Sequence, residues 1–191
     1  NTTRLGATQP KLQYAGTSHE AEWTSMKRLL IMRHAKSDYP PKIADDFHRP
    51  LNRRGRRDVP RMARLLTLYD AVPECILSST ALRARETATA MAELLGLSEN
   101  QTAFEDDLYL ASADDLLSCV RRIEEGVGSL MVVAHNPGLE AWISRLCGCR
   151  LQLPTAAIAA LSIDADSWSA MGDKGVWMEW FVVPRLLKAL G

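Results

Sequence analysis

The sequence predicts an α/β fold, a three-layer α/β/α sandwich with a mostly parallel central sheet. Short apolar runs, typical of buried strands, alternate along the chain with longer stretches in which apolar residues recur at helical spacing. This alternation favours a sheet whose central strands are parallel and are joined through helices. A length of 191 residues fits one domain with a sizeable core, and no internal repeat is visible.

The first half of the fold is predicted as two strand–helix pairs. The run RLLIM (28–32) is short and apolar, as in a buried strand, and the following helix is expected within 51–69, with Asn52 as its cap. Pro60 lies inside that stretch, so the helix either begins late or is kinked there. The second pair is predicted from CILS (75–78) and from 81–96, a helix that Gly96 closes.

The second half continues the alternation. A helix is expected over 112–125, where Ser112 and Asp115 form a capping box, and the run LMVVA (130–134) is predicted as a strand. Pro137 suits the first position of a helix over 137–148. Two last strands, separated by a polar link that contains glycine, are expected at 157–164 and 177–183.

Residues 1–25 differ in composition from the rest of the chain. They show no hydrophobic period, are rich in Thr, Ser, Gly and Gln, and begin with Asn rather than Met. We interpret them as an N-terminal extension, which is a processed end, a linker or a remnant of expression, and the domain as residues 26–191. A cytoplasmic location is expected, or an organelle if residues 1–25 belong to a transit segment, since no acidic residue precedes Glu20.

Composition argues against several classes of partner. Lys plus Arg balances Asp plus Glu, so no overall charge favours nucleic acid or a membrane, and no apolar run reaches the roughly 18 residues of a spanning helix. The C-x-C of Cys147 and Cys149 has no second pair or neighbouring histidine, so all four cysteines are expected to be free thiols. No metal and no cofactor is predicted.

Three predicted strands are each followed by polar or cationic side chains. Because the carboxyl ends of parallel strands meet at one edge of a sheet, we expect these side chains to converge there. Helices that begin near residues 80 and 137 would add their positive dipole ends. The predicted ligand is a dianion, most simply a phosphoryl group. The residues at the three strand ends are Arg33, His34, Ser78, Ser79, Arg83, His135 and Asn136.

Four segments, LLIMRHAKSD, LNRRGRRD, ILSSTALRARETA and VVAHNPGLEAW, carry a family resemblance. In order and spacing they resemble the signatures of the histidine phosphatase superfamily, and within it those of the SixA-type phosphohistidine phosphatases. The resemblance extends from about Met26 to the end of the chain and implies a phosphoglycerate mutase-like fold. The usual Arg-His-Gly reads Arg33-His34-Ala35 here, which leaves the reacting groups in place.

The resemblance also implies a metal-independent reaction. His34 would attack phosphorus and form a transient phosphohistidine, while Arg33 and Arg83 hold the phosphoryl oxygens. His135, protonated when phosphate is bound, would bind a further oxygen and stabilise the transition state. Further contacts to the substrate are expected from Lys36, Ser37 and Asn136.

The substrate is expected to be phosphohistidine on a protein. Larger members of the superfamily that cleave phosphate esters carry an acidic proton donor before the third strand, and the segment FEDDLYLASADDLL holds no carboxylate clearly at that position. An imidazole leaving group needs this proton less than an alkoxide does. The interval of about fifty residues between Arg83 and His135 leaves little room for a cap, so the pocket should be open.

Other interpretations stay open. The seven arginines between Arg49 and Arg64, against the single acid Asp58, are either a solvated helical face or a docking patch for an acidic phosphoprotein. Nucleic acid is disfavoured because no aromatic platform is interleaved with these arginines. A small phosphorylated substrate would instead indicate a phosphomonoesterase or mutase of the same superfamily. A non-catalytic phosphate-binding adaptor is the alternative of another class.

Overall fold

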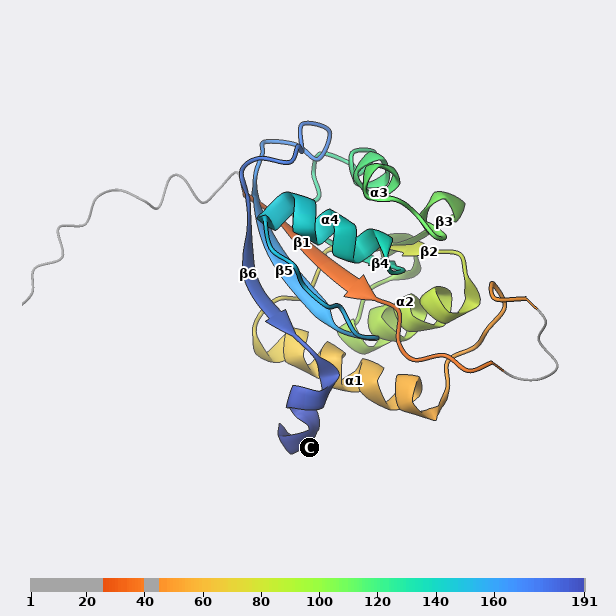
Figure 1. The fold of residues 1–191 in the computed structure, drawn as a ribbon. Coiled ribbons are helices and arrows are strands. Elements are labelled where there is room, and N and C mark those ends of the chain that lie inside the picture. Colours follow the sequence, from red (N-terminus) through yellow and green to blue (C-terminus); the bar gives the residue numbers. More distant parts are fainter. Residues whose placement is uncertain (1–25, 40–44, 191) are drawn as a thin grey trace, which may run out of the picture.

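The computed structural model describes residues 26–39 and 45–190, and the prediction for residues 1–25 lies outside them. One six-stranded sheet forms the centre of the fold, in the order β3-β2-β4-β1-β5-β6 (Figure 1). β1 pairs in parallel with β4, β4 with β2, and β2 with β3, whereas β5 and β6 are added antiparallel at the other edge. The strands are β1 (Met26–Arg33), β2 (Cys75–Ser79), β3 (Thr102–Glu105), β4 (Ser129–Ala134), β5 (Ile158–Asp164) and β6 (Val176–Val182).

Helices cover both faces of the sheet, which confirms the predicted three-layer α/β sandwich. Helices α1 (Arg53–Leu68) and α2 (Leu82–Leu95) lie on one face, and α3 (Ala113–Val120) and α4 (Gly138–Cys147) lie on the other (Figure 1). Alternate residues of β1 divide between the two cores: Leu30 and Met32 pack with α1 and α2, and Leu29 and Ile31 pack with α3 and α4. Burial on both faces explains why β1 is a continuous apolar run. The described residues also form the 3₁₀ helices η2 (Glu99–Gln101), η3 (Asp106–Leu108) and η4 (Pro184–Leu190).

Several helix ends form as the sequence predicts. The side chain of Asn52 accepts a hydrogen bond from the Gly55 amide and caps α1. α1 begins at Arg53 and contains Pro60, so it does not begin late. Gly96 closes α2 in the left-handed conformation, and Ser112 opens α3 through the predicted capping box.

Two elements differ from the prediction. α3 ends at Val120 rather than near residue 125, and the side chains of the next two residues bond elsewhere, Arg121 to the carbonyl of Met171 and Arg122 to Asp107. The short strand β3 was not predicted. It has four residues and pairs with β2 alone, so its tertiary pairing defines it more than its composition does. None of the described helices has the length and apolar character needed to cross a membrane.

Candidate active site

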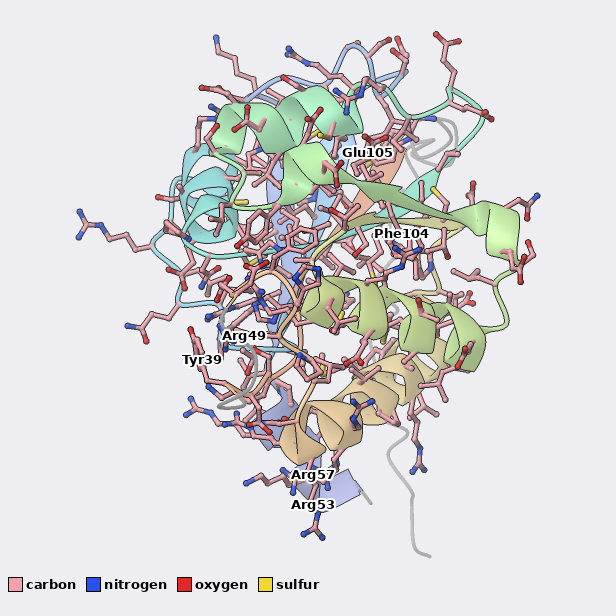
Figure 2. All side chains as sticks on the ribbon, turned by 90° about the vertical axis from the view of Figure 1, so that its right-hand side faces the viewer. Tyr39, Arg49, Arg53, Arg57, Phe104 and Glu105 are labelled. Carbon is pink, nitrogen blue, oxygen red and sulfur yellow. The ribbon has the colours of Figure 1, made fainter. Side chains whose placement is uncertain are left out.

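The three strand ends that the sequence singled out meet at one edge of the sheet. β4 lies between β1 and β2, and Arg33 is in register with Ala134, so His34 and His135 follow neighbouring strands. The centroids of the two imidazole rings are 5.0 Å apart. β1 points toward the right-hand side of Figure 1, and Figure 2 views the molecule from that side.

The backbone fixes the tautomer of His34. Its Nδ1 lies 2.8 Å from the carbonyl oxygen of Ala35, which can only accept, so Nδ1 carries the proton and donates. Nε2 therefore has a lone pair, and it accepts a hydrogen bond from Nε of Arg83 at 3.3 Å. Burial, together with the nearby His135 and Arg83, lowers the pKa of His34 to about 3, although the hydrogen bond to Ala35 acts in the opposite direction. His34 is therefore a neutral imidazole with its nucleophilic nitrogen facing an arginine.

His135 is also held neutral in the free protein. Its Nε2 lies 2.9 Å from the hydroxyl of Ser79, and its buried Nδ1 has no hydrogen-bond partner in the part of the chain that the structure describes. Burial lowers the pKa of His135 to about 3, and the positive charge of Arg83 acts in the same direction. A dianion in the cavity would oppose both effects, because it favours the charged imidazole.

Arg83 is buried despite its place in the first turn of α2. Its side chain has two partners: Nε donates a hydrogen bond to His34, and the two terminal nitrogens donate to Asp46. Thr87, one helical turn further on, donates its hydroxyl to the Arg83 carbonyl and accepts the amide hydrogen of Ala35. This hydroxyl ties the loop of His34 to the helix of Arg83.

The side chain of Arg33 is held by the backbone at Leu153 rather than by Asp46. Its NH1 donates to the carbonyl oxygen of Leu153, while its buried Nε has no hydrogen-bond partner among residues 26–39 and 45–190. Burial lowers the pKa of Arg33, but a guanidinium stays charged in proteins. Asn136 donates to the same carbonyl and to Glu140, whose carboxylate also accepts the amide hydrogen of Leu153.

Arg49 anchors a loop and also borders the cavity. Its guanidinium lies 3.2 Å over the ring centre of Tyr39. It donates to the hydroxyl of Ser37, the carbonyl oxygen of Asp38 and the carboxylate of Asp46. These bonds fix the segment that follows β1 against the segment that precedes α1, and Figure 2 shows Tyr39 and Arg49 beside each other.

Asp46 is a residue that the sequence analysis missed. It accepts from NH2 of Arg83 at 2.8 Å, from NH1 of Arg49 at 2.6 Å and from the hydroxyl of Tyr109 at 3.1 Å. Partial burial raises the pKa of Asp46, but the hydrogen bond from Arg49 and the charge of Arg83 outweigh it and bring the pKa below its ordinary value. Burial and the bond to Asp46 raise the pKa of Tyr109, which keeps the phenol protonated. An anion therefore already occupies the donors of Arg83.

A cavity of about 300 Å³ joins these residues. All four predicted catalytic residues and the three predicted binding residues border it, with Lys36 exposed and Ser37 buried. Within residues 26–39 and 45–190, no cluster of His, Cys, Asp and Glu could hold a metal ion. The lining residues are Arg33, His34, Lys36, Ser37, Tyr39, Asp46, Arg49, Arg83, Leu110, His135, Asn136 and Thr155.

The carboxylates of the segment 104–117 lie outside this cavity. Asp106 accepts from Thr80, and Asp107 pairs with Arg122. Asp114 and Asp115 occupy the first turn of α3, as the sequence predicts. The expectation that this segment brings no proton donor to the site agrees with these contacts, and the carboxylate at the site comes from the loop before α1 instead.

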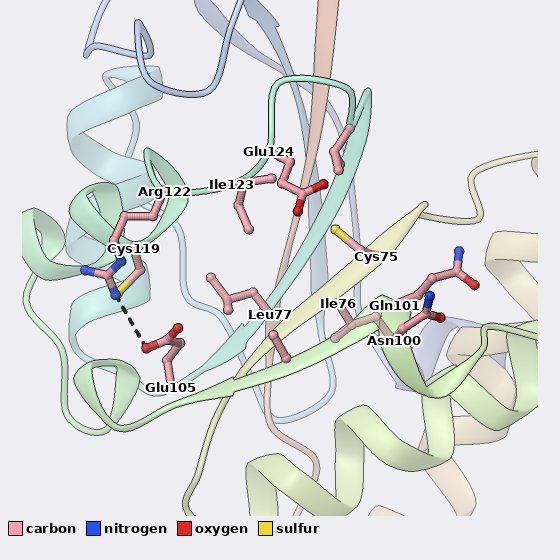
Figure 3. Close-up of a pocket in the computed structure, with 12 residues that line it drawn as sticks. Cys75, Ile76, Leu77, Asn100, Gln101, Glu105, Cys119, Arg122, Ile123 and Glu124 are labelled. Atoms are coloured by element: carbon pink, nitrogen blue, oxygen red, sulfur yellow. Dashed lines mark hydrogen bonds and ion pairs between the residues drawn. The ribbon is translucent and has the colours of Figure 1, made fainter.

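A second cavity, of about 290 Å³, lies beside β2 and β3 (Figure 3). It is bordered by the thiols of Cys75 and Cys119, and all four cysteines are free, as predicted. Burial raises the pKa of Cys75 to about 11 and also raises that of Cys119, so both are protonated and weakly nucleophilic. The chemistry of this fold is therefore concentrated at the histidine cavity.

Comparisons with known proteins place these residues in a family context. Residues 29–108 match the model of the histidine phosphatase superfamily (branch 1). An uncharacterised chloroplastic protein of Arabidopsis thaliana is 31% identical over 170 residues, which are 83% of this chain and 78% of the relative. The structure of the protein histidine phosphatase SixA complexed with tungstate is similar, with a TM-score of 0.72 and 25% identity over 84% of this chain and 99% of that chain. SixA from Agrobacterium tumefaciens has a TM-score of 0.70 and 28% identity over 83% and 98%.

Proposed function

Because this chain belongs to the histidine phosphatase superfamily and is a phosphatase of the SixA type, we propose that it removes phosphoryl groups from phosphohistidine on proteins, without a metal and through a phosphorylated His34. The observation that carries the proposal is the state of His34. Its Nδ1 proton is held by the Ala35 carbonyl, so the lone pair of Nε2 faces the cavity and Arg83. A neutral imidazole fixed in this tautomer is ready to attack phosphorus.

Three cationic or potentially cationic groups surround the place where the phosphoryl group would lie. The guanidinium groups of Arg33 and Arg83 would bind its oxygens, and the unpartnered Nε of Arg33 is a donor without a competing acceptor. His135 would take up a proton as the dianion enters and would then donate to another oxygen. Phosphoryl transfer depends mainly on positioning and charge stabilisation, so this set can act without a metal.

The form of the cavity supports a phosphorylated side chain as the substrate. Between α2 and β4 the chain forms only η2, β3, η3 and α3, and none of these is a cap domain over the cavity. The cavity is small and bordered mostly by polar residues. Lys36, Ser37 and Asn136 would contact the phosphoryl group or the atoms next to it. Three of the matched structures carry the name SixA, and tungstate in one of them is an oxyanion of phosphate-like shape.

The cationic surface of α1 supports docking of an acidic phosphoprotein. Six arginines lie between Arg53 and Arg64, against Asp58 as the only acid of that stretch. Asp58 is buried and pairs with Arg54, Arg57 and Arg61, of which the first two are more than half exposed, and Arg56 pairs with Glu86. Figure 2 shows Arg53 and Arg57 on the side of the molecule that also carries Tyr39 and Arg49 at the cavity.

Phosphate release from a histidine-phosphorylated protein, with no added metal, tests the proposal. Wild type should release phosphate, and His34→Asn should be slower by at least about a hundredfold, because it removes the nucleophile. His48→Asn is the matched control, since His48 is exposed and outside the cavity. Equal rates for wild type and His34→Asn would refute the role of His34.

Asp46 favours a second candidate, a phosphatase or mutase that acts on small phosphate esters. A carboxylate near Arg83 is a group that could protonate an alkoxide. Sugar phosphates and phosphoglycerate, assayed beside the phosphoprotein, separate the two functions. A mutase would in addition require a long-lived phosphoenzyme, which intact mass measurement detects. Preference for the small esters would replace the phosphohistidine proposal.

A further inference from the structure

Asp46 occupies the donors of Arg83 that a phosphoryl group would need. NH2 of Arg83 donates to its Oδ2 at 2.8 Å, and NH1 donates to its backbone carbonyl oxygen at 2.6 Å. The remaining nitrogen, Nε, donates to the nucleophilic nitrogen of His34. Both edges of the guanidinium are thus engaged by groups of the protein itself. A phosphoryl group that Arg83 binds and His34 attacks competes with these internal partners for the same guanidinium.

The surroundings of Asp46 make its protonation depend on that replacement. Arg49 faces the carboxylate from its own loop, Arg83 from α2, Tyr109 from the end of η3, and His135 from the end of β4. In the free protein the two arginines favour the carboxylate. When a phosphoryl dianion binds Arg83, the positive charge of the guanidinium is shared between the dianion and Asp46. An ionised Asp46 beside the dianion then becomes unfavourable. Asp46 has a side chain that is 42% exposed, so a proton can reach it from solvent.

We propose that Asp46 is the proton donor of the reaction and that the transfer of Arg83 from Asp46 to the phosphoryl group enables this role. The inference rests on the proposed function and extends it, because the sequence offered no proton donor. It also predicts a further activity: a site with its own acid can cleave phosphate monoesters with basic leaving groups as well as phosphohistidine.

Each proton and bond in this step has a defined origin and destination. The lone pair of Nε2 of His34 forms a bond to phosphorus as the bond from phosphorus to the leaving atom breaks. That atom keeps the electron pair and takes the proton of the Asp46 carboxyl group. In the second half, the Asp46 carboxylate takes a proton from the water that attacks phosphorus, and the bond between phosphorus and Nε2 breaks. The electron pair of that bond returns to Nε2, phosphate leaves, Arg83 pairs with Asp46 again, and Asp46 releases its proton to solvent.

Asp46→Asn tests the proposal, because the amide keeps the size of the side chain but loses the charge and the transferable proton. Asp45→Asn is the matched control, since Asp45 is exposed and, among the described residues, bonds to the amide of Phe47 and to His48. We expect Asp46→Asn to bind inorganic phosphate about tenfold more tightly, because a neighbouring negative charge is removed. We also expect it to hydrolyse an alkyl or unsubstituted phenyl phosphate about a hundredfold more slowly. A dinitrophenyl phosphate, whose leaving group needs no proton, should react at a nearly wild-type rate.

The leaving-group series separates proton donation from a structural role. An equal loss of kcat for dinitrophenyl and alkyl phosphates would overturn the proposal, as would unchanged or weaker binding of inorganic phosphate to Asp46→Asn. Asp45→Asn should resemble wild type in both measurements. Failure of the proposed function has a different signature: wild type would then not release phosphate from phosphohistidine, although Asp46→Asn would still bind inorganic phosphate more tightly than wild type.

Discussion

Lowering the pH from 7 to 5 should destabilise the fold through His34 and His135. Both side chains are nearly inaccessible, with 7% and 3% exposure, and both have a pKa of about 3 in the folded state, against an ordinary value of 6.5. Between these values the unfolded chain binds protons that the folded chain does not, so stability falls as the pH falls below about 6.5 and continues to fall toward 3. At 1.36 kcal/mol per pKa unit, the loss between pH 7 and pH 5 is about 2 kcal/mol for each histidine and about 4 kcal/mol for the pair.

Urea unfolding at pH 7 and pH 5 measures this loss. Ordinary carboxylates titrate below pH 5, so proton uptake by the histidines dominates the change in stability between pH 7 and pH 5. His34→Asn and His135→Asn should each reduce the difference between the two pH values by about 2 kcal/mol, whatever each substitution does to stability at pH 7. The reasoning would be refuted if both variants kept the full pH dependence of wild type, because the protons would then be taken up elsewhere.

Three further predictions concern the packing, the partner and the metal. Gly138→Ala should lower the free energy of unfolding by about 2–4 kcal/mol, because a Cβ there would overlap the carbonyl oxygen of Ala111. Its control Gly126→Ala, which has open space around it, should change that energy by less than about 1 kcal/mol, and equal thermal midpoints for the two variants would contradict this view of the packing. Arg53→Glu combined with Arg57→Glu should raise KM for an acidic phosphoprotein about tenfold at low salt and leave the hydrolysis of a small aryl phosphate unchanged. Steady-state kinetics that show the same effect on both substrates would exclude docking on α1. Incubation with EDTA should not change the rate, and a loss that added metal restores would contradict a metal-independent reaction.

The layers of the fold were accessible from the sequence because their signals are local. The run 28–32 is apolar without alternation, which matches a strand covered on both faces, and Asn52 and Gly96 mark helix ends through their own backbone chemistry. Strand β3 has no such local signal. Its residues pair only with β2, so its conformation depends on a partner more than twenty positions away.

The residues of the candidate site likewise fall into those with a local sequence signal and those without one. Residues that directly follow strands could be placed at one edge of the sheet, because a strand end fixes where the next side chain lies. Asp46 belongs to a loop, and its position depends on Arg49 and Arg83 rather than on a neighbouring strand. The acidic residues of the DDFHRPL segment, which also contains Arg49, were the available signal, but no local rule directs a loop carboxylate toward an arginine on another helix.

The hydroxyl of Thr87 has a mechanical consequence. It binds the amide of Ala35 and the carbonyl of Arg83 at the same time, so one side chain couples the position of the His34 loop to that of Arg83. If helix α2 shifts slightly against the sheet, these two hydrogen bonds favour a joint displacement of the loop and the arginine. The spacing between His34 and Arg83 can thus survive small movements of the layers around it, and serine is the replacement best suited to preserve that linkage.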